Sequence, residues 1–418
     1  MVAFQPIVEL GLAATSAGVF VLDSSLLDGA DVLAGGDGFV WTDVTDDVVG
    51  PVRCQRGSQQ GSVPTLRYDG GSISFELDNQ DGRYDPANTS GPFYPQLKPG
   101  VAVRLRVESD NWIYGPWTVF TGVVSSWQPR YPAGDLISTV EIAGEDNVAL
   151  FARADLPALD TAVGAGESAT DRLDRIADRI GWPAAKRHYE TSSGSIATMQ
   201  ATTMAQPAWT EMLLTADSDC GFVWFDQVGT LRYTGPAQIP AGVFIEFDMD
   251  SPSSMAYYDE FEPRFDLEEV FNAANIARAG GHTVSAVDET GVAESGLRAY
   301  TRTDLICETD DQCDRVAQWV VFWRGRARYR IGSITCRGTR DLLFLLNLDM
   351  GKRLKVVQHT PDGRDVTVEG LSRGLEWTIH PAVGEWELRI AMQSVRPAIL
   401  DAFILDSSLL DSAEILVP

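Results

Sequence analysis

Alternating apolar and polar residues predict a series of β-strands between residues 51 and 155. Ile73, Phe75 and Leu77 alternate with Ser and Glu, and residues 101–107 repeat the pattern. A period of two places apolar side chains on one face of a strand and polar side chains on the other. The stretches WTVFTGVVSSW and STVEIAGED continue the pattern, with Gly and Pro between them. Several short strands at this spacing predict a β-sandwich or barrel.

The pattern changes to a helical period after residue 156. Within ESATDRLDRIADRIGWP, apolar residues recur at helical spacing: Leu173, Ile176, Ala177 and Ile180. A Gly and a Pro follow as stop signals, so the spacing predicts a helix. A second short helix is predicted over 209–215, and GFVWFDQVGTLRY predicts a hairpin that turns at 226–229. Together these elements predict a small α+β insert.

A second β region is predicted from residue 266 onward, with one helix inside it. Thr309 and Gln312 have capping-box spacing. The residues after them have apolar helical spacing: Cys313, Val316, Ala317 and Val320. Arginines then alternate with apolar residues over 326–331, which predicts a strand with one basic face. Further strands are predicted in RLKVVQH, DVTVEGL, LEWTIH and EWELRIAM.

These patterns predict a mainly β protein with a smaller α+β insert and two tube-like β-barrel or sandwich domains per chain. A chain of 418 residues is too long for one ordinary core. We expect five parts: 1–50 as an N-terminal segment and docking arm, 51–155 as the first β-barrel domain, 156–265 as the α+β insert, 266–396 as the second β-barrel domain with one helix, and 397–418 as a C-terminal arm.

The two ends of the chain share a repeated segment. VFVLDSSLLDGADVLA (19–34) and AFILDSSLLDSAEILV (402–417) agree at ten of sixteen aligned positions. A duplicated segment indicates a duplicated role. Either each copy lies on the edge or in a groove of a neighbouring subunit, where its apolar side chains fill pockets, or each forms a local hairpin that begins a β domain. The sequence leaves both interpretations open.

The stretch SFELDNQDGRYDPANTSGPFYPQLKPG (74–100) has the composition of a calcium loop. An EF-hand loop needs an acid at position 1, Gly at position 6 and Glu at position 12. With Gly82 at position 6, the two ends are Leu77 and Asn88, so the match fails. Asn and Asp side chains also hydrogen-bond their own backbone, which predicts a series of turns after a strand.

The chain is strongly acidic, with 33 basic and 59 acidic side chains and a net charge of −26. This balance argues against binding nucleic acid by neutralising its phosphates. It suits a surface that DNA passes without adhering.

Cysteine, histidine and hydropathy patterns give no sign of export or of a metal site. The five cysteines are odd in number and form no C-x-x-C pair, which indicates synthesis in a reducing compartment. The four histidines are dispersed, so we expect no metal and no cofactor. The start of the chain lacks a basic segment, and no run of 18 apolar residues occurs. We expect a soluble protein made in the cytoplasm, without membrane insertion.

One catalytic pattern occurs, the G-x-S-x-G motif at 370–374. Its Ser372 would be the nucleophile of a hydrolase elbow, which needs a strand, a sharp turn, a helix and then an acid followed by a histidine. The residues after the motif alternate as a strand, and His380 precedes Asp401. Because this context is wrong, we expect no catalytic residues and no enzyme activity.

The remaining charged groups have simpler interpretations. Acid pairs such as Asp46–Asp47 and Asp259–Glu260 arise by chance in so acidic a chain, so we expect solvated carboxylates. The arginines at 326–330 suit either a phosphate or acids on a partner subunit, and the overall charge favours the subunit contact.

Aromatic residues and one glycosylation sequon also have structural interpretations. Trp112, Trp117 and Trp127 lie near predicted strands, where core packing is the expected role of a tryptophan. Residues 88–90 form an Asn-Thr-Ser sequon, but no secretory signal gives it meaning.

Several runs resemble the opening barrel of minor tail proteins from long-tailed bacteriophages, in particular those of actinobacterial hosts. They are WTDVTDDV, LDNQDGRYDPANTSGPFYPQLKPG, WTVFTGVVSSW and VEIAGEDNVALFARADLP, within about residues 40–155. PAWTEMLLTADSDCGFVWFDQVGTLRYTG is similar to the helix-plus-hairpin insert of baseplate or tail-tip hub proteins. From YRIGSITCRG to EWELRIAM the chain resembles their second barrel.

The resemblance implies a structural hub at the tail tip of the virion, synthesised in the host cytoplasm. Such hubs are homotrimers whose two related barrels per chain make a pseudo-sixfold ring, which joins the sixfold tail tube and distal tail protein to a threefold tip. The ring would surround the channel through which the tape measure protein and DNA leave, and it would carry further tip or receptor-binding proteins. An acidic lumen would repel phosphates. No peptidase or lysozyme-like extension follows the second barrel, so wall degradation would belong to another protein.

Other interpretations remain open at this point. The chain could be the hexameric distal tail protein, although a sixfold ring needs only one barrel per chain. It could also be a carbohydrate-binding receptor or cell-wall-degrading tail protein. A DNA-binding portal component is disfavoured by the negative charge.

Overall fold

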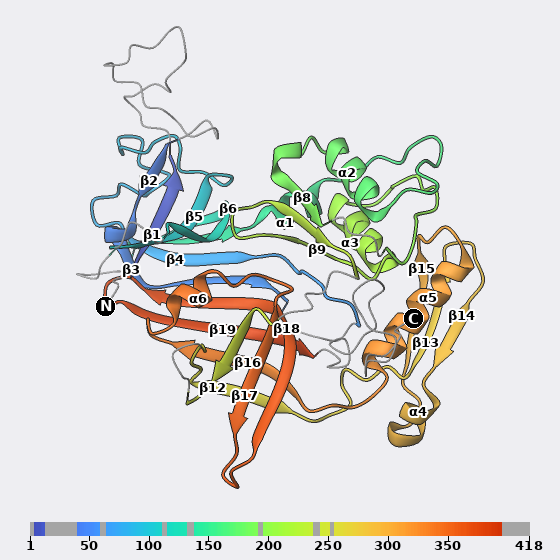
Figure 1. Cartoon of the computed structure of the whole chain (residues 1–418). Helices are drawn as coiled ribbons and strands as arrows, with labels where there is room; N and C mark the ends of the chain where they lie inside the picture. Colours follow the sequence, from blue (N-terminus) through green and yellow to red (C-terminus); the bar gives the residue numbers. More distant parts are fainter. Residues whose placement is uncertain are drawn as a thin grey trace.

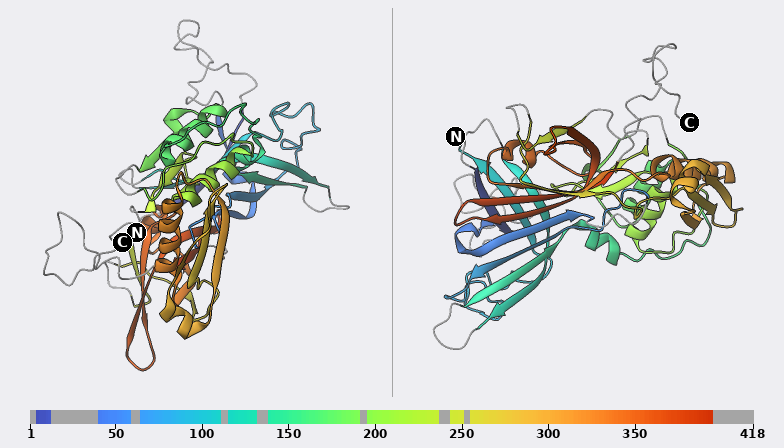
Figure 2. Two further views of the ribbon diagram at one scale, coloured as in Figure 1. Left: turned by 90° about the vertical axis from the view of Figure 1, so that its right-hand side faces the viewer. Right: turned by 90° about the horizontal axis from the view of Figure 1, so that it is seen from below.

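The fold is organised around one large β-sheet to which two smaller α/β units are attached (Figure 1). The structure is a computed structural model that describes residues 4–12, 40–58, 64–110, 115–131, 138–190, 195–236, 243–250 and 255–394. Figure 2 shows most of the helices gathered at one end of the molecule and the long strands of the large sheet at the other.

Thirteen of the described strands form the large sheet. Along its main path the order is β12 (Glu260–Arg264), β16 (Arg330–Arg337), β19 (Glu385–Ser394), β18 (Asp365–His380), β3 (Val48–Gly57), β4 (Ser72–Asp78), β7 (Thr139–Glu145), β6 (Trp117–Arg130), β5 (Ala102–Ser109), β1 (Phe4–Gly11) and β2 (Trp41–Asp43). From β18 the sheet also extends through β17 (Arg353–His359) to β11 (Ile245–Asp248). Neighbouring strands are antiparallel except β11 and β17.

Strand β18 joins the first and last parts of the chain. Its residues 365–371 pair with β17, and its residues 374–379 pair with β3 along the same edge. Strand β19 pairs along the other edge. Where the partner changes, Gly57 (φ 83°) faces Gly374, and a Cβ on Gly57 would lie 2.2 Å from the carbonyl oxygen of Arg373. Only glycine allows the two backbones to approach this closely.

The predicted mainly β fold with a smaller α+β insert is confirmed, whereas two separate closed barrels are not observed. The strands predicted over 51–155 and over 353–393 all form, and DVTVEGL and LEWTIH are parts of the single strand β18. They belong to one sheet because β3 and β18 pair edge to edge. Among the described residues, no strand pairing closes this sheet on itself.

The predicted α+β insert has helices packed on a three-stranded sheet. In spatial order its strands are β8 (Arg187–Glu190), β10 (Leu231–Thr234) and β9 (Phe222–Phe225), and its helices are α1 (Asn147–Arg153), α2 (Ala169–Arg179) and α3 (Ala208–Ser218). Helix α1 precedes the predicted start of the insert and lies in the region that was predicted to be β. Both predicted helices and the hairpin are confirmed. Helix α2 starts at a capping box and buries Leu173, Ile176 and Ala177, as their spacing predicts.

An aromatic cluster forms the centre of this insert. Its rings come from α1, α3, β9 and the segment after α2, with centroids 5.1 to 6.5 Å apart: Phe151, Trp182, Trp209 and Phe225. Edge-to-face contacts of this kind add to the stabilisation from burial.

A second small α/β unit lies inside the region predicted as the second barrel. Its sheet has the order β14 (Val284–Val287), β13 (Ala273–Arg278), β15 (Ala299–Leu305), and α5 (Asp310–Arg324) packs against it. The Thr309–Gln312 capping box of α5 is confirmed. Where the sequence predicted one helix, α4 (Glu289–Ser295) and α6 (Leu342–Leu346) are also present. These two are too short to show a helical period.

The N-terminal segment is partly a component of the large sheet. Residues 4–11 form β1, which pairs with β5 and β2. The repeat at 19–34, its copy at 402–417 and Trp112 lie outside the described residues. The five-part division of the chain remains a prediction.

Turns fill the Asp- and Asn-rich stretch after β4. Side-chain oxygens accept hydrogen bonds of 2.8 to 3.1 Å from backbone amides two to five residues further along the chain: Asp78, Asn79, Asp81, Asp85 and Asn88. The Tyr84 hydroxyl donates to Asp47 at 2.5 Å. These bonds confirm the predicted turn chemistry, because they orient the side-chain oxygens toward the local backbone.

Glu269 is a buried carboxylate that joins three elements of the fold. It pairs with Arg324 at the end of α5 (3.2 Å), Arg330 at the start of β16 (2.9 Å) and Arg373 in β18 (3.5 Å). None of these side chains is more than 8% exposed. Arg324 also donates to the carbonyl oxygen of Pro64 from Nε and Nη2 at 3.2 Å. Helix α5 is thereby connected to the large sheet.

The surroundings of these arginines set their pKa values in opposite directions. Burial lowers the pKa of Arg324 to about 10, although the charge of Glu269 opposes this. Burial also acts to lower the pKa of Arg330, but the hydrogen bond to Asp266 and the charge of Glu269 outweigh it and raise the pKa. The cluster depends on Glu269, which is its most deeply buried carboxylate.

Asp146 is a buried N-cap at the start of α1. Its Oδ1 accepts from the backbone amide of Val148 at 2.9 Å, and its Oδ2 accepts from the Tyr68 hydroxyl at 2.7 Å. Burial raises the pKa of Asp146 to about 6, although these donors oppose the rise. The folded protein is therefore less stable with Asp146 ionised than with Asp146 protonated.

Calcium should leave the melting temperature of the protein unchanged, because the oxygens of residues 78–88 already accept backbone hydrogen bonds. Thermal unfolding with calcium and with a chelator measures this. A calcium-dependent rise that Asp85→Ala abolishes would contradict the turn assignment.

Glu269→Gln should lower the free energy of unfolding by about 3–5 kcal/mol, because it leaves buried arginines without their charge partner. Urea denaturation measures the change. Glu268→Gln is the matched control, since Glu268 contacts Arg330 but is 65% exposed, and we expect a change within about 0.5 kcal/mol. Equal losses would show that burial of the carboxylate is not the cause.

Asp146→Asn should remove one pH dependence of stability while keeping the helix cap. The folded pKa of about 6 lies above the usual value of 3.8, so the contribution of Asp146 is full below pH 3.8 and is lost as the pH rises through 6. The difference between the two pKa values corresponds to about 3 kcal/mol in the free energy of unfolding. The wild-type protein should lose that amount relative to the variant between pH 3.5 and 7 in denaturation experiments. Parallel pH curves would contradict the assignment.

Candidate functional site

A polar band crosses the joint between the two halves of the large sheet. It lies on β19, β18, β3, β4 and β7, where strand register aligns residues of one face. One row consists of Arg389, Glu376, Gln55, Ser72 and Glu145, and the next of Glu387, Thr378, Arg53, Ser74 and Ala143. All ten are at least partly exposed.

The opposite face of the same five strands is buried. Its side chains include Leu388, Ile390, Leu375, Trp377, Cys54, Ile73, Phe75 and Ile142. Alternation of this kind fixes the register, because a slip of one residue would expose the apolar set. The sheet is therefore a continuous wall with core on one side and the polar band on the other.

Carboxylates outnumber arginines on the polar face of these five strands. The carboxylates are Glu76, Asp78, Glu141, Glu145, Glu376, Glu385 and Glu387, and the arginines are Arg53 and Arg389. Arginines from nearby positions pair with three of the acids: Arg130 with Glu141, Arg153 with Glu145 and Arg337 with Glu387. Exposed pairs of this kind contribute little free energy, so the band remains acidic but is locally neutralised.

Ser372 has a structural role in strand β18. It is fully buried. Its Oγ donates to the Asp349 carbonyl oxygen at 2.6 Å and accepts from the Lys352 amide at 2.9 Å. The G-x-S-x-G motif lies within a strand, as the alternation after it predicts. Asp401 is outside the described residues. The Ser372 hydroxyl therefore connects β18 to the segment before β17 by hydrogen bonds.

The predicted basic strand at 326–331 is wrong in its extent. Strand β16 begins only at Arg330, because the chain leaves α5 through Gly325 and an irregular segment. Arg326 pairs with Asp288 at 3.0 Å, and Arg330 pairs with Asp266 and Glu269. These acids belong to the same chain, so Arg326 and Arg330 need no partner subunit to explain them.

The acid pairs singled out in the sequence lie at the surface or in local contacts. Asp46 is exposed, and Asp47 accepts from Tyr84. Asp259 accepts from the backbone amide of Arg337, whose side chain pairs with Glu260 at 2.7 Å.

The tryptophans have the predicted packing role. Trp117 and Trp127 are half-buried and pack against the hydrophobic core. In addition, Trp117 contacts the ring of Phe4 at 6.1 Å. The sequon at Asn88 lies in the turn segment after β4, where its side chain donates to the Gly82 carbonyl oxygen.

Within the described ranges, no group of three or more His, Cys, Asp or Glu side chains is arranged to hold a metal ion. None of the helices in the same ranges is both long and apolar enough to cross a bilayer. All five cysteines are free and buried.

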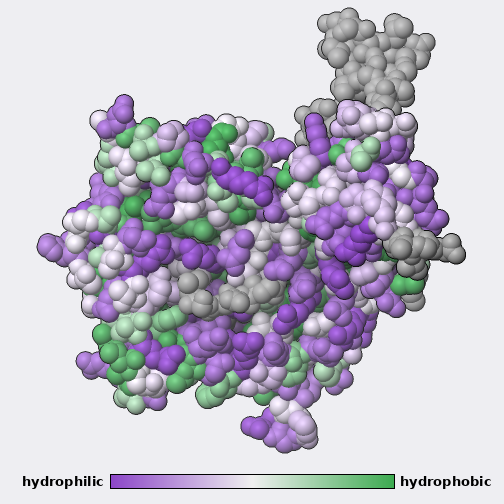
Figure 3. Space-filling model, turned by 180° about the vertical axis from the view of Figure 1, so that it is seen from behind, coloured by the Kyte–Doolittle hydropathy of each residue, from purple (hydrophilic) through white to green (hydrophobic). Residues whose placement is uncertain are grey.

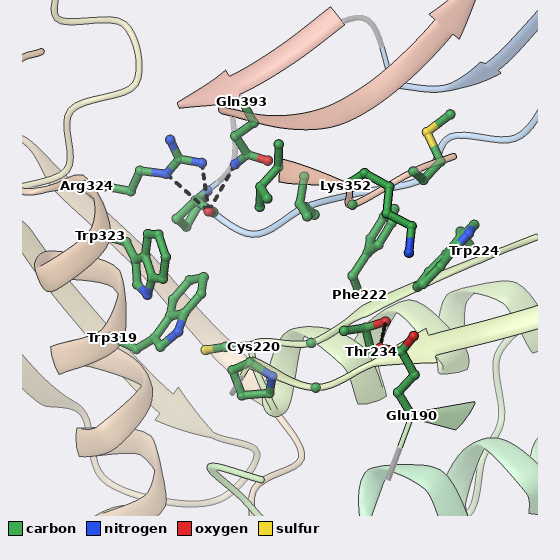
Figure 4. Close-up of a pocket in the computed structure, with 18 residues that line it drawn as sticks. Glu190, Cys220, Phe222, Trp224, Thr234, Trp319, Trp323, Arg324, Lys352 and Gln393 are labelled. Atoms are coloured by element: carbon green, nitrogen blue, oxygen red, sulfur yellow. Dashed lines mark hydrogen bonds between the residues drawn. The ribbon is translucent and has the colours of Figure 1, made fainter. Parts of the chain in front are cut away.

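A cleft lies where the insert, helix α5 and the large sheet meet (Figure 4). Its enclosed volume is about 60 Å³, within a wider hollow that opens to solvent. Its apolar walls come from all three parts: Leu66, Phe222, Trp224, Trp319, Trp323 and Leu371. At one end, Arg324 and Gln393 both donate to the carbonyl oxygen of Pro64. Its mainly apolar lining with a few polar groups is typical of a binding site, whereas its enclosed volume is below the roughly 300 Å³ of a small-molecule pocket.

Sequence reasoning did not find this cleft or the Glu269 cluster. Both form from residues far apart in the chain, such as Phe222 and Leu371, which no local period connects. One signal was present: Trp319 and Trp323 are four residues apart and share one side of a helix.

No protein-family model matches this sequence, and no curated protein sequence matches it. Solved structures are nevertheless similar over nearly the whole chain. The 43 kDa tail protein of prophage MuSo2 from Shewanella oneidensis has a TM-score of 0.57 at 15% identity, covering 94% of this chain and 98% of that one. A tail protein from Neisseria meningitidis MC58 has a TM-score of 0.55 at 15% identity, covering 93% and 96%. Prophage tail protein gp18 from Listeria monocytogenes EGD-e has a TM-score of 0.50 at 10% identity, covering 95% and 97%.

Identities this low establish the fold alone. The chain has the fold of these prophage tail proteins, and this confirms at the level of fold the resemblance to phage tail proteins that its sequence indicated.

Proposed function

We propose that this protein is a structural hub at the tip of a phage tail, where three chains form a pseudo-sixfold ring around the ejection channel. The observation that carries the proposal is the pairing of β3 with β18, which fuses two strand-rich modules into one wall with a polar band across the joint. The fold shared with prophage tail proteins supports the same assignment.

The two modules of each chain would give the ring its symmetry. Three chains with two modules each present six similar units to a sixfold tail tube and three chains to a threefold tip. The main path of the described sheet ends at β2 and β12, whose outer edges pair with no described strand, and its side branch ends at β11. Contacts between neighbouring chains at such edges would complete each tube-like module and cover exposed backbone groups.

We assign the polar band to the channel wall. It spans both modules without interruption, and its excess of carboxylates would keep phosphates from adhering while DNA passes. The exposed pairs with Arg130, Arg153 and Arg337 would reduce the repulsion, so that the wall slows neither DNA nor the tape measure protein.

Apolar side chains away from the band would serve subunit and partner contacts. Phe265, Leu297 and Val383 are each at least two-thirds exposed. The face shown in Figure 3 is largely hydrophilic, with smaller hydrophobic groups between. The partners in this role would be the distal tail protein, the tail tube and receptor-binding tip proteins, and the hub would act by geometry without turnover.

The purified protein should assemble as a trimer. Light scattering should give three chains of 45.6 kDa, and electron microscopy down the axis should show a ring with a central opening. A hexamer would instead favour the distal tail protein, and a monomer at all concentrations would overturn the hub. Release of fragments from host cell walls would identify a degrading enzyme.

A further inference from the structure

The cleft between the insert, α5 and the large sheet has the features of a site that another segment fills. Its walls include six large apolar side chains from three separate parts of the fold, named above. Trp319 and Trp323 extend from α5 toward Cys220 and Phe222 on the other side (Figure 4). Leaving this much aromatic surface in a solvent-open cleft costs free energy, at about 25 cal/mol per Å². A docked apolar segment would recover it.

Two donor groups at the cleft have no oxygen acceptor among the described residues. Trp224 is 7% exposed, and its indole N–H has no hydrogen-bond acceptor. Lys352 lies 5.8 Å from the ring of Phe244 and forms no salt bridge within the described ranges. A buried donor without an acceptor and a lone cation in an acidic protein both indicate an occupant that supplies oxygen atoms and negative charge.

The chain leaves the described residues at the cleft, and its sequence continues into a segment of this chemistry. Gln393 lines the cleft, and the chain continues from it into residues 395–418, which lie outside the described residues. The stretch AFILDSSLLDSAEILV (402–417) places apolar groups between Asp, Ser and Glu. Leu409 is 16 positions beyond Gln393, so an extended connection reaches at most about 55 Å, enough to turn back.

We propose that residues 402–417 dock in this cleft, with leucines against the tryptophans and an acidic side chain near Lys352. The first copy of the repeat, at 19–34, follows β1 in the sequence, and β1 lies on the opposite side of the molecule from α5 (Figure 1). The inference does not depend on the hub assignment, because it rests on the cleft and on where the chain leaves it.

A photo-crosslinking residue in place of Leu409 in the full-length protein tests the docking. After irradiation, mass spectrometry should find links to α5, β9 or residues 350–352. A link between two chains would place the segment in the cleft of a neighbouring chain and would also support the docking. Links elsewhere, or none, would overturn it. The same crosslinker in place of Leu26, at the matching position of the first copy, is the control. If Leu26 alone marks the cleft, the proposed occupant is wrong.

Charge reversal at the cleft provides a second measurement. Lys352→Glu should lower the yield of the Leu409 link about threefold, the effect of losing one exposed ion pair. Lys98→Glu makes the same change at an exposed position outside the cleft and should leave the yield unchanged. Equal yields in the two variants would overturn the role of Lys352, and an absent link in both would overturn the docking. Trimer formation is measured in a separate experiment. The hub proposal and the docking proposal can therefore fail independently of each other.

Discussion

The edge-to-edge pairing of β3 with β18 is the interaction on which the rest of the structure depends. Six residues of each strand are in register, and the joint is possible because Gly57 and Gly374 let the backbones meet. Without this pairing, the buried faces of the two modules would not be aligned with each other, and neither would their polar faces. With it, one face becomes a continuous core boundary and the other a continuous polar surface.

The local elements of this fold could be predicted from the sequence because their signals are local. The helix at Leu173, the capping box of α5 and the strand with Phe75 each follow from spacing within fewer than fifteen residues. The turn chemistry after β4 was predictable for the same reason, since an Asp or Asn side chain bonds an amide a few positions away.

The joint, the cleft and the buried ion cluster could not be predicted, because each depends on residues separated by long stretches of chain. A period of two shows that β18 is a strand but not which strand lies beside it. Arg330 was predicted to lie on the basic face of a strand, yet its side chain is buried and pairs with Glu269. Short elements such as α4, α6 and β2 carry too few residues for any period, so tertiary contacts decide their conformation.

The same joint constrains how the protein is made on the ribosome. Residues 52–57 of β3 leave the ribosome early, whereas their partners at 374–379 are added near the end of synthesis. At a synthesis rate of about 5–20 residues per second, the edge of β3 stays unpaired for about 15–60 s before β18 is made. During that time it is an unpaired strand edge, which is a template for aggregation between nascent chains. The risk of aggregation at this edge therefore ends only when the last part of the chain has been synthesised and β18 can pair with β3.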